Sequence, residues 1–298
     1  MIKKMLIDTY AHLYWESFKQ DFAAVIQRSK EAGVELIVNV GVDVEKSRIA
    51  AELENNQIKF YSTIGIHPHE VLRLVSLAQD KHTNINLQIQ QEMQKLEEIY
   101  HKNPKKIIGV GECGLDFFFE SNPDWTAEKL TVDEIKDLQR KLFQAQIDLA
   151  KKLDLPLLVH CRDDRSKNPN NVECWNECLE MVRGWKGILH CYSGTETITN
   201  HILSKSELDN FLVSFAGNIT YPKNEYLRKA IRSFPLEKIV LETDCPFLAP
   251  QSKRGQRNEP SSVRDIAELI AEIKEASFEE VAKFTTTNVT RLFKLVLE

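Results

Sequence analysis

Histidines and carboxylates stand at the ends of several short apolar runs. Four of these residues are Glu112, His160, His190 and Asp244. Imidazoles and carboxylates that meet in a small volume repel one another or stay desolvated unless a cation joins them. This pair of ligand types suits zinc, manganese, iron or magnesium-like ions better than a thiolate site would. We therefore expect the four residues to share a divalent-metal site.

The same residues suit hydrolysis at phosphorus. A carboxylate between two ions about 3.5–4 Å apart is the arrangement used for phosphoryl displacement, and Glu112 is the natural bridge. Asp244 can hold an ion and accept a proton from the attacking water. Arg162 follows shortly after His160, and its forked guanidinium suits a phosphate oxygen. We expect one or two ions per chain, with a metal-bound water as the nucleophile.

An aromatic stretch follows the run that contains Glu112. Its residues Phe117, Phe118, Phe119 and Trp125 are either stacking surfaces for bases or members of the hydrophobic core. The sequence alone leaves both interpretations open.

The apolar runs that position these residues predict strands. Most are continuous, which is typical of a strand that is covered on both faces. The predicted strands are Met5–Thr9, Glu35–Val40, Phe60–Ile66, Lys106–Glu112, Pro156–His160, Gly187–His190, Phe211–Phe215 and Lys238–Thr243.

Amphipathic stretches alternate with these strands. They include predicted helices over Phe18–Ala32, Thr131–Leu153, Glu225–Ile231, Val263–Ile273, Ser277–Phe284 and Asn288–Leu297. Alternation without hairpin turn signals indicates parallel strands with helical crossovers. We therefore predict a slightly distorted TIM-type (β/α)8 barrel, a single α/β domain over residues 1–298, whose strand ends meet at one mouth. An open doubly wound sheet is the alternative, but no Gly-x-Gly-x-x-Gly turn follows an early strand.

Composition bounds the function further. The chain has 298 residues, of which 42% are hydrophobic and 28% charged, and this excludes a disordered chain. No apolar run approaches the roughly 18–20 residues that cross a bilayer, so we expect no membrane partner and a cytoplasmic protein. The net charge of −5 argues against indiscriminate nucleic-acid binding, although a nuclease needs only a local basic lining. A monomer is compatible with the sequence, which does not fix the oligomeric state.

Several ordered motifs together resemble the TatD family of metal-dependent deoxyribonucleases, within the amidohydrolase-like barrels. The resemblance runs from about Leu6 to Phe293. It rests on the motifs Gly65-Ile66-His67-Pro68-His69, Gly109-Val110-Gly111-Glu112-Cys113-Gly114-Leu115-Asp116-Phe117, Leu155-Pro156-Leu157-Leu158-Val159-His160-Cys161-Arg162, His190-Cys191-Tyr192-Ser193-Gly194, Leu241-Glu242-Thr243-Asp244-Cys245-Pro246 and Arg254-Gly255-Gln256-Arg257-Asn258-Glu259-Pro260.

The resemblance implies cleavage of DNA phosphodiester bonds with Mg²⁺ or Mn²⁺, often as a 3′–5′ exonuclease, with Zn²⁺ as a further candidate. It implies DNA as the substrate and partner. The positions that match the family's metal ligands are Glu112, His160, His190 and Asp244. His67 matches the Gly-x-His-Pro motif near the scissile phosphate. Glu242 matches a residue that supports the metal ligands without binding the ion itself.

The first strand departs from the family pattern. Many members have His-x-His there, whereas this chain has Tyr10-Ala11-His12. A neutral phenol is a poor ligand at pH 7, so we expect one metal position to be weak or rebuilt, with His12 as its remaining candidate ligand. Two other functions stay open: an amide or ester hydrolase of the deacylase type on the same metals, and a binding protein whose site has decayed.

Overall fold

Eight parallel strands form one sheet in the computed structural model, which describes residues 5–80, 84–118, 130–166 and 168–296. Each strand pairs with the next one along the chain, so the spatial order is the sequence order. The strands are β1 (Leu6–Ala11), β2 (Val34–Val40), β3 (Lys59–Ile64), β4 (Ile107–Asp116), β5 (Leu157–Arg162), β6 (Gly187–Leu189), β7 (Phe211–Phe215) and β8 (Ile239–Leu241).

The first and last strands meet and close the sheet into a barrel. Ala11 and Cys245 form a parallel bridge, and the His12 amide donates to the carbonyl of Cys245 over 2.9 Å. The Asp244 amide donates to the carbonyl of Tyr10, also over 2.9 Å. The predicted TIM-type barrel is therefore confirmed, and the carboxyl ends of β1 and β8 lie side by side.

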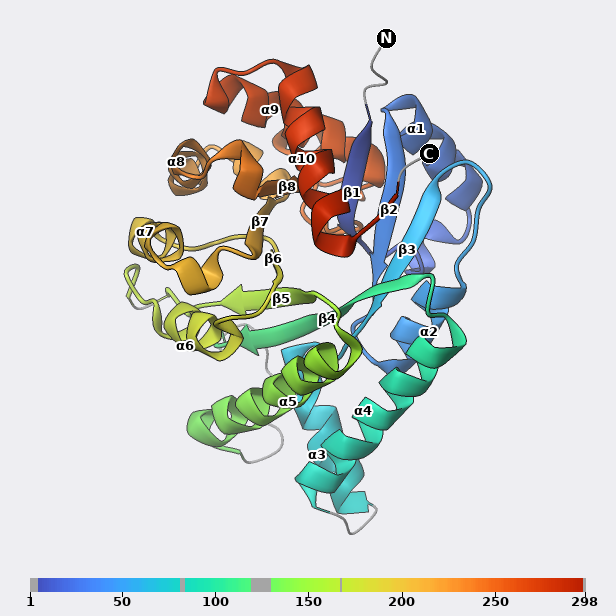
Figure 1. The fold of residues 1–298 in the computed structure, drawn as a ribbon, viewed down its shortest axis with the longest axis vertical. Helices are drawn as coiled ribbons and strands as arrows, with labels where there is room; N and C mark the ends of the chain where they lie inside the picture. The colour runs from blue at the N-terminus through green and yellow to red at the C-terminus, as the bar shows by residue number, and fades with distance from the viewer. Residues whose placement is uncertain (1–4, 81–83, 119–129, 167, 297–298) are drawn as a thin grey trace.

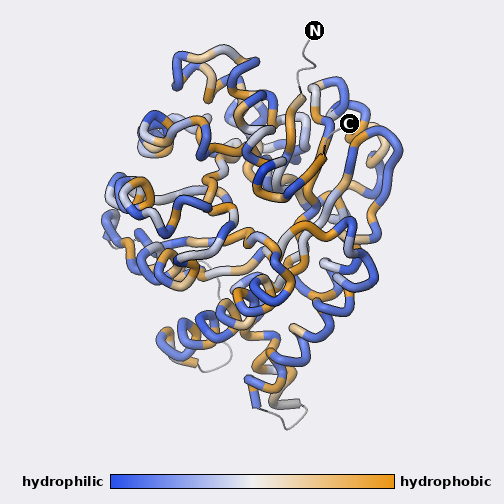
Figure 2. The backbone as a smooth tube through the Cα atoms, viewed as in Figure 1, coloured by the Kyte–Doolittle hydropathy of each residue, from blue (hydrophilic) through white to orange (hydrophobic). Residues whose placement is uncertain are grey.

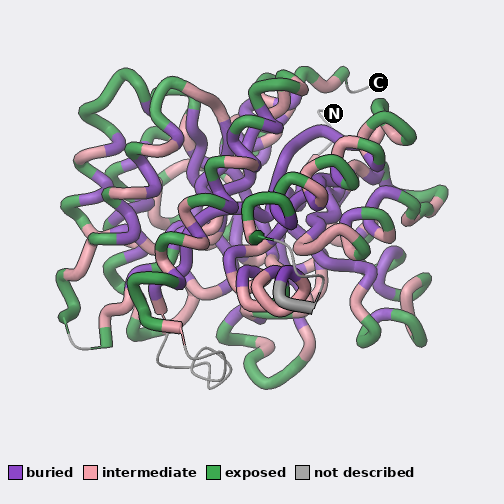
Figure 3. Tube along the Cα trace, turned by 90° about the horizontal axis from the view of Figure 1, so that it is seen from below, coloured by how far each residue is buried: buried purple, intermediate pink, exposed green. Residues whose placement is uncertain are grey.

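Helices surround the sheet and cover its outer face (Figure 1). They are α1 (Phe22–Glu31), α2 (Val44–Glu52), α3 (Val71–Asp80), α4 (Ile85–Lys102), α5 (Val132–Leu153), α6 (Glu173–Val182), α7 (Glu196–Ser204), α8 (Glu225–Ser233), α9 (Val263–Lys274) and α10 (Phe278–Phe293). Hydrophobic segments run through the strands and along one side of the helices (Figure 2), and the same segments are buried (Figure 3). None of the described helices is long and apolar enough to cross a membrane.

One strand boundary differs from the prediction in a way that matters for the site. Strand β4 continues beyond Glu112 to Asp116, because Leu115 and Asp116 pair with Cys161 and Arg162 of β5. Glu112 therefore lies within a strand rather than at its end.

The chain after Ser277 forms one helix, α10, rather than the two that were predicted. The threonines between the predicted helices do not interrupt it. Thr285 and Thr287 donate their hydroxyl hydrogen bonds to the carbonyls of Val281 and Lys283, one turn earlier, so the polar groups are satisfied inside the helix.

Asp8 links β1 to the segment after β8 from a fully buried position. Its carboxylate accepts hydrogen bonds from the Thr243 amide at 2.9 Å and the Thr243 hydroxyl at 2.6 Å. Burial outweighs these bonds and raises the pKa of Asp8 to about 8. Asp8 therefore orients β1 relative to the segment after β8, and it does not join the candidate ligands.

Replacing Asp8 by asparagine should flatten the pH dependence of stability. Folding raises the pKa of Asp8, so its contribution to stability is fully present below pH 3.8 and is lost as pH rises toward 8. Over that window Asp8 contributes a slope of about 1.4 kcal/mol per pH unit to the stability of the wild type, and Asp8→Asn removes that contribution. Urea unfolding between pH 4 and 8 measures the difference. The exposed Asp148→Asn variant should keep the wild-type slope, and an equal slope in Asp8→Asn would contradict this account.

Candidate metal centre

Three imidazole nitrogens converge on one carboxylate oxygen, Oε1 of Glu112. His160 Nδ1 lies 3.0 Å from it, His67 Nε2 3.4 Å and His190 Nε2 3.9 Å. The four side chains come from β4 and from the ends of β5, β3 and β6, so the barrel closure assembles them. Glu112 and His190 are buried, and His160 is partly exposed at the mouth. The structure thus brings together three of the four residues predicted to share a metal: Glu112, His160 and His190.

Glycine lets β4 approach β5 closely beside this cluster. Gly114 has a φ of 139°, and a Cβ atom there would lie 1.9 Å from the carbonyl oxygen of His160. A side chain would therefore both strain the backbone and push β5 away. The pairing of Gly114 with His160 holds the backbones of β4 and β5 together beside Glu112.

Two of the three clustered histidines are each backed by a second carboxylate. His190 Nδ1 lies 2.9 Å from Oε2 of Glu242, and His160 Nε2 lies 3.0 Å from Oδ2 of Asp116. A carboxylate behind an imidazole fixes the tautomer and ring orientation, and leaves the opposite nitrogen free for a ligand. Both free nitrogens face Glu112. The structure therefore places Glu242 where the family resemblance expects a supporting residue.

Asp116 and His69 were not among the predicted site residues. His69 Nε2 lies 2.9 Å from the same Asp116 oxygen that His160 faces, and the His67 and His69 rings are 4.5 Å apart. Both residues stand in the motifs that carry the family resemblance, and this was the available signal. The signal was not decisive because the extension of β4 to Asp116 depends on its pairing with β5.

His12 and Asp244 form a separate pair across the closure of the barrel. His12 Nε2 lies 3.6 Å from Oδ1 of Asp244, while His12 Nδ1 lies 2.9 Å from the carbonyl oxygen of Val40. Asp244 has a left-handed backbone with a φ of 57°, a conformation that aspartate tolerates better than most residues. Among the described residues, the groups of three donors close enough to hold an ion are His67–Asp116–His160 and Glu112–His160–His190. The pair does not join either of them.

Tyr10 fills the space between the pair and the cluster. Its ring stacks on His190 with centroids 3.5 Å apart and meets His12 edge-on at 5.3 Å. Burial, followed by the charges of Glu112 and Asp244, raises the pKa of Tyr10 well above its usual value. The phenol therefore keeps its proton at neutral pH.

The charges of the cluster are strongly coupled. Burial alone would raise the pKa of Glu112, but the neighbouring His67, His160 and His190 hold it well below its usual value. Burial alone would lower the pKa of His160, but hydrogen bonds to Asp116 and Glu112 raise it to about 10. Burial lowers the pKa of His67 to about 3. Without a metal, the cluster therefore holds an anionic Glu112 beside a cationic His160 and a neutral His67 at pH 7.

Arg162 lies at the rim rather than in the cluster. Its side chain is exposed, and its guanidinium carbon is 4.0 Å from the ring centroid of Phe118. Phe117 is buried in the core, whereas Phe119 and Trp125 lie outside the described residues. Of the predicted aromatic stretch, Phe118 is thus the residue that the structure places beside a cation at the mouth.

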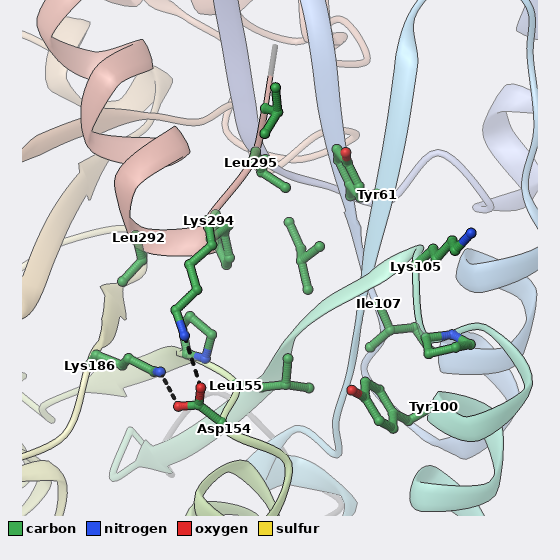
Figure 4. Close-up of a pocket in the computed structure, with 15 residues that line it drawn as sticks. Tyr61, Tyr100, Lys105, Ile107, Asp154, Leu155, Lys186, Leu292, Lys294 and Leu295 are labelled. Carbon is green, nitrogen blue, oxygen red and sulfur yellow. Dashed lines mark hydrogen bonds and ion pairs between the residues drawn. The ribbon is translucent and has the colours of Figure 1, made fainter.

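A cavity of about 450 Å³ lies at the opposite end of the barrel, where β4 and β5 begin. Figure 4 shows Tyr61, Tyr100 and Ile107 on one side, and Asp154 bonded to Lys186 and Lys294 on the other. None of the candidate ligands lines it. In barrels of this type, catalytic residues lie at the carboxyl ends of the strands, which is where the cluster lies.

Residues 7–294 match the model of a protein family described as TatD related DNase. This chain belongs to the TatD family. A relative, the uncharacterized metal-dependent hydrolase YabD of Bacillus subtilis (strain 168), is 33% identical over 291 residues, which cover 98% of this chain and 100% of YabD. The crystal structure of the TatD homologue YJJV from Escherichia coli K12 matches with a TM-score of 0.77 and 26% identity, covering 99% of this chain and 100% of YJJV.

An uncharacterized amidohydrolase from Saccharomyces cerevisiae shares the TatD barrel, with a TM-score of 0.74 at 16% identity, over 97% of this chain and 99% of the yeast chain. The match shows the fold alone. Family membership and the named relatives make this TatD-family chain a metal-dependent hydrolase.

The described residues fit one divalent ion. Ligand atoms about 2.0–2.2 Å from a tetrahedral ion lie on the order of 3.4 Å apart, similar to the separations among Glu112, His160 and His190. Because a neutral imidazole has one lone pair, His160 can ligate through Nδ1 toward Glu112 or through Nε2 toward Asp116, but not both. We assign Asp116 the supporting position, since it already takes bonds from two histidines.

Replacing Asp116 by asparagine should weaken metal binding about 10- to 100-fold, because His160 loses the charge that fixes its orientation. Titration of metal-free protein with Mn²⁺ measures the change. Asp163→Asn is the matched control, since Asp163 is also buried but accepts from the Cys174 amide outside the cluster. Equal affinities for wild type and Asp116→Asn would show that Asp116 does not act through His160.

Proposed function

We propose that this TatD-family hydrolase cleaves DNA phosphodiester bonds, as a 3′–5′ exodeoxyribonuclease that uses Mg²⁺ or Mn²⁺. The observation that carries the proposal is the cluster around Glu112 Oε1, which matches the needs of a hydrolytic metal centre. Two further features favour a phosphodiester: the family's description as TatD related DNase, and the Arg162–Phe118 pair at the rim. A guanidinium binds phosphate oxygens, and an aromatic face stacks on bases.

The proposed roles follow from the geometry. Glu112, His160 and His190 would hold a divalent ion, which would supply Lewis acidity and lower the pKa of a nearby water. Asp244, whose Oδ1 lies 3.6 Å from His12 Nε2, is assigned the role of accepting a proton from the attacking water.

His67 and Arg162 are proposed to hold the phosphate. His67 Nε2 faces Glu112 from the end of β3, and its pKa of about 3 keeps it neutral, so it can donate a hydrogen bond without carrying charge. Arg162 supplies the positive charge at the rim, where the developing charge of the phosphate would lie. His67 and Arg162 therefore contribute different interactions to the same group.

A substrate survey tests the reaction class. Protein incubated with Mn²⁺, whose bound metal is then measured, is given single-stranded DNA, an aminoacyl ester and a small amide at equal concentrations. The proposal expects turnover of DNA alone and a loss of that turnover on adding EDTA. Turnover of the ester or amide without DNA cleavage would instead favour the deacylase type of hydrolase. No turnover, together with no bound metal, would favour a decayed site that serves binding.

A further inference from the structure

Phe247 presents an aromatic ring to solvent shortly after Asp244 in the chain. The residue is 48% exposed. Its amide donates to the carbonyl of Asp244 over 2.9 Å, which closes a tight turn. The buried side chain of Asn258 donates to the carbonyls of Thr243 and Phe247 over 2.9 Å and 2.7 Å. These bonds fix the backbone on both sides of Asp244, so the fold sets where the Phe247 ring stands relative to that carboxylate.

Trp15 extends this ring into a larger aromatic surface at the carboxyl ends of β1 and β8. The Trp15 and Phe247 ring centroids lie 6.2 Å apart with the ring planes at 82°. The His12 ring lies 6.2 Å from Phe247 and 5.9 Å from Trp15, which is partly exposed. Single exposed apolar side chains are ordinary, whereas exposed rings that adjoin one another commonly mark a ligand site. The surface adjoins Asp244 through His12, whose Nε2 faces that carboxylate.

Lys46, in the first turn of α2, adds a positive charge to this surface. Its ammonium lies 5.5 Å from the centroid of the Trp15 ring. Within the part of the chain that the structure describes, this ammonium has no carboxylate as an ion-pair partner. A flat apolar face beside a free cation is complementary to a nucleotide, because a base stacks on aromatic rings while a phosphate pairs with the cation.

We propose that Trp15, Lys46 and Phe247 form a nucleotide subsite beside Asp244, in which a base packs against the two rings and Lys46 pairs with a phosphate. The subsite rests on the proposed function, and it names the part of the substrate that the segments after β1, β2 and β8 hold. Every base has an aromatic face, so the subsite accepts each of the four bases.

The strand order places this subsite opposite the Arg162–Phe118 pair. The subsite lies where β1 and β8 close the barrel, whereas Phe118 and Arg162 lie at the ends of β4 and β5, halfway round the eight-stranded sheet. A single strand that contacts both sites therefore crosses the mouth that contains the ligand cluster.

Phe247→Ala tests the contact with the base. Binding of a fluorescently labelled oligothymidylate is followed by anisotropy in EDTA, which prevents metal-dependent cleavage. Phe247→Ala should bind it about 5- to 150-fold more weakly than the wild type, because one stacked base is lost. Phe247→Tyr keeps the ring and should bind like the wild type. An oligomer with abasic sites in place of the bases should bind wild type and Phe247→Ala equally. Equal affinities of these two proteins for oligothymidylate would overturn the base contact.

Trp185 offers a matched control for Trp15. It is also partly exposed, and the Lys186 ammonium lies 5.2 Å from its ring centroid, but it precedes β6 at the opposite end of the barrel. Trp15→Ala should weaken oligothymidylate binding as Phe247→Ala does, whereas Trp185→Ala should leave it unchanged. Equal losses in the two tryptophan variants would overturn the location of the subsite.

Lys46→Ala tests the contact with the phosphate through the salt dependence of binding. Each phosphate that a protein neutralises on a single strand contributes about 0.7 to the slope of log affinity against log salt concentration. Lys46→Ala should therefore make this slope shallower by about 0.7. Phe247→Ala changes no charge and should keep the wild-type slope. An unchanged slope in Lys46→Ala would overturn the phosphate contact.

Turnover with Mn²⁺ separates the subsite from the proposed function. Phe247→Ala should raise KM for single-stranded DNA by a factor similar to its loss of binding, with little change in kcat, because the base is held equally before and during the reaction. A wild type that cleaves DNA with a KM that Phe247→Ala leaves unchanged would overturn the subsite and keep the nuclease proposal. A wild type that binds oligothymidylate through Phe247 but leaves it uncut would keep the subsite and overturn the proposed function. A wild type that binds no oligothymidylate would overturn the subsite.

Discussion

Replacing Glu112 by glutamine should reduce hydrolysis by about 10³-fold or more while leaving the fold intact. Glu112 Oε1 is the point on which His67, His160 and His190 converge, so the loss of its charge removes the anionic ligand of the cluster. A bound ion contributes several kcal/mol of transition-state stabilisation, and a 10³-fold loss corresponds to about 4 kcal/mol. The measurement is kcat/KM together with the metal content of the purified protein.

Glu92→Gln is the matched control for this variant. Glu92 is also buried, but it lies on α4, away from the mouth, where it pairs with Arg73 of α3 and Lys95 of α4. It should keep full metal content and turnover. Circular dichroism should show equal helix content in both variants. A Glu112→Gln protein that retains turnover would remove Glu112 from its central role.

Metal binding should tighten steeply as pH rises. In the metal-free protein, Asp116 and Glu112 outweigh burial and hold the pKa of His160 at about 10, so an ion must displace a proton from this ring. The apparent Kd should therefore fall about tenfold per pH unit between pH 7 and 9 for each proton displaced. Calorimetry in buffers of different ionisation enthalpy counts the protons directly.

The raised pKa of His160 also makes the stability of the metal-free protein depend on pH. Folding raises the pKa of His160 from 6.5 to about 10, so its contribution is fully present below pH 6.5 and is lost as pH rises toward 10. Added Mn²⁺ should restore stability in that alkaline window, because the ion binds the folded state. A Kd that stays constant from pH 7 to 9 would show that His160 is neutral before the ion binds.

Much of the barrel and the cluster was predictable from local patterns. Buried parallel strands appear in the sequence as continuous apolar runs. The polar residues at the ends of these strands must meet at one mouth of the barrel. These two features predict that Glu112, His160 and His190 meet, and the three residues lie within ligand distance of one another in the structure. They lie close together because the closed barrel brings these strand ends to one mouth.

The remainder depended on contacts that no local pattern contains. The place of Asp116 behind His160 follows from the extra pairing of β4 with β5. The separation of the His12–Asp244 pair from Glu112 follows from the ring of Tyr10, whose stacking on His190 joins strands far apart in sequence. The sequence marked Tyr10 as a departure from the family, but only packing shows that it fills the space between two groups of ligands.

Degradation of end-labelled single-stranded DNA decides whether the protein is a 3′–5′ exodeoxyribonuclease. DNA labelled at its 3′ or 5′ end is incubated with the wild-type protein and Mg²⁺ or Mn²⁺, beside samples with EDTA. We expect metal-dependent release of the 3′ label as single nucleotides, while the 5′ label stays on progressively shorter strands. Intact DNA in the presence of a fully metal-loaded protein would contradict this expectation.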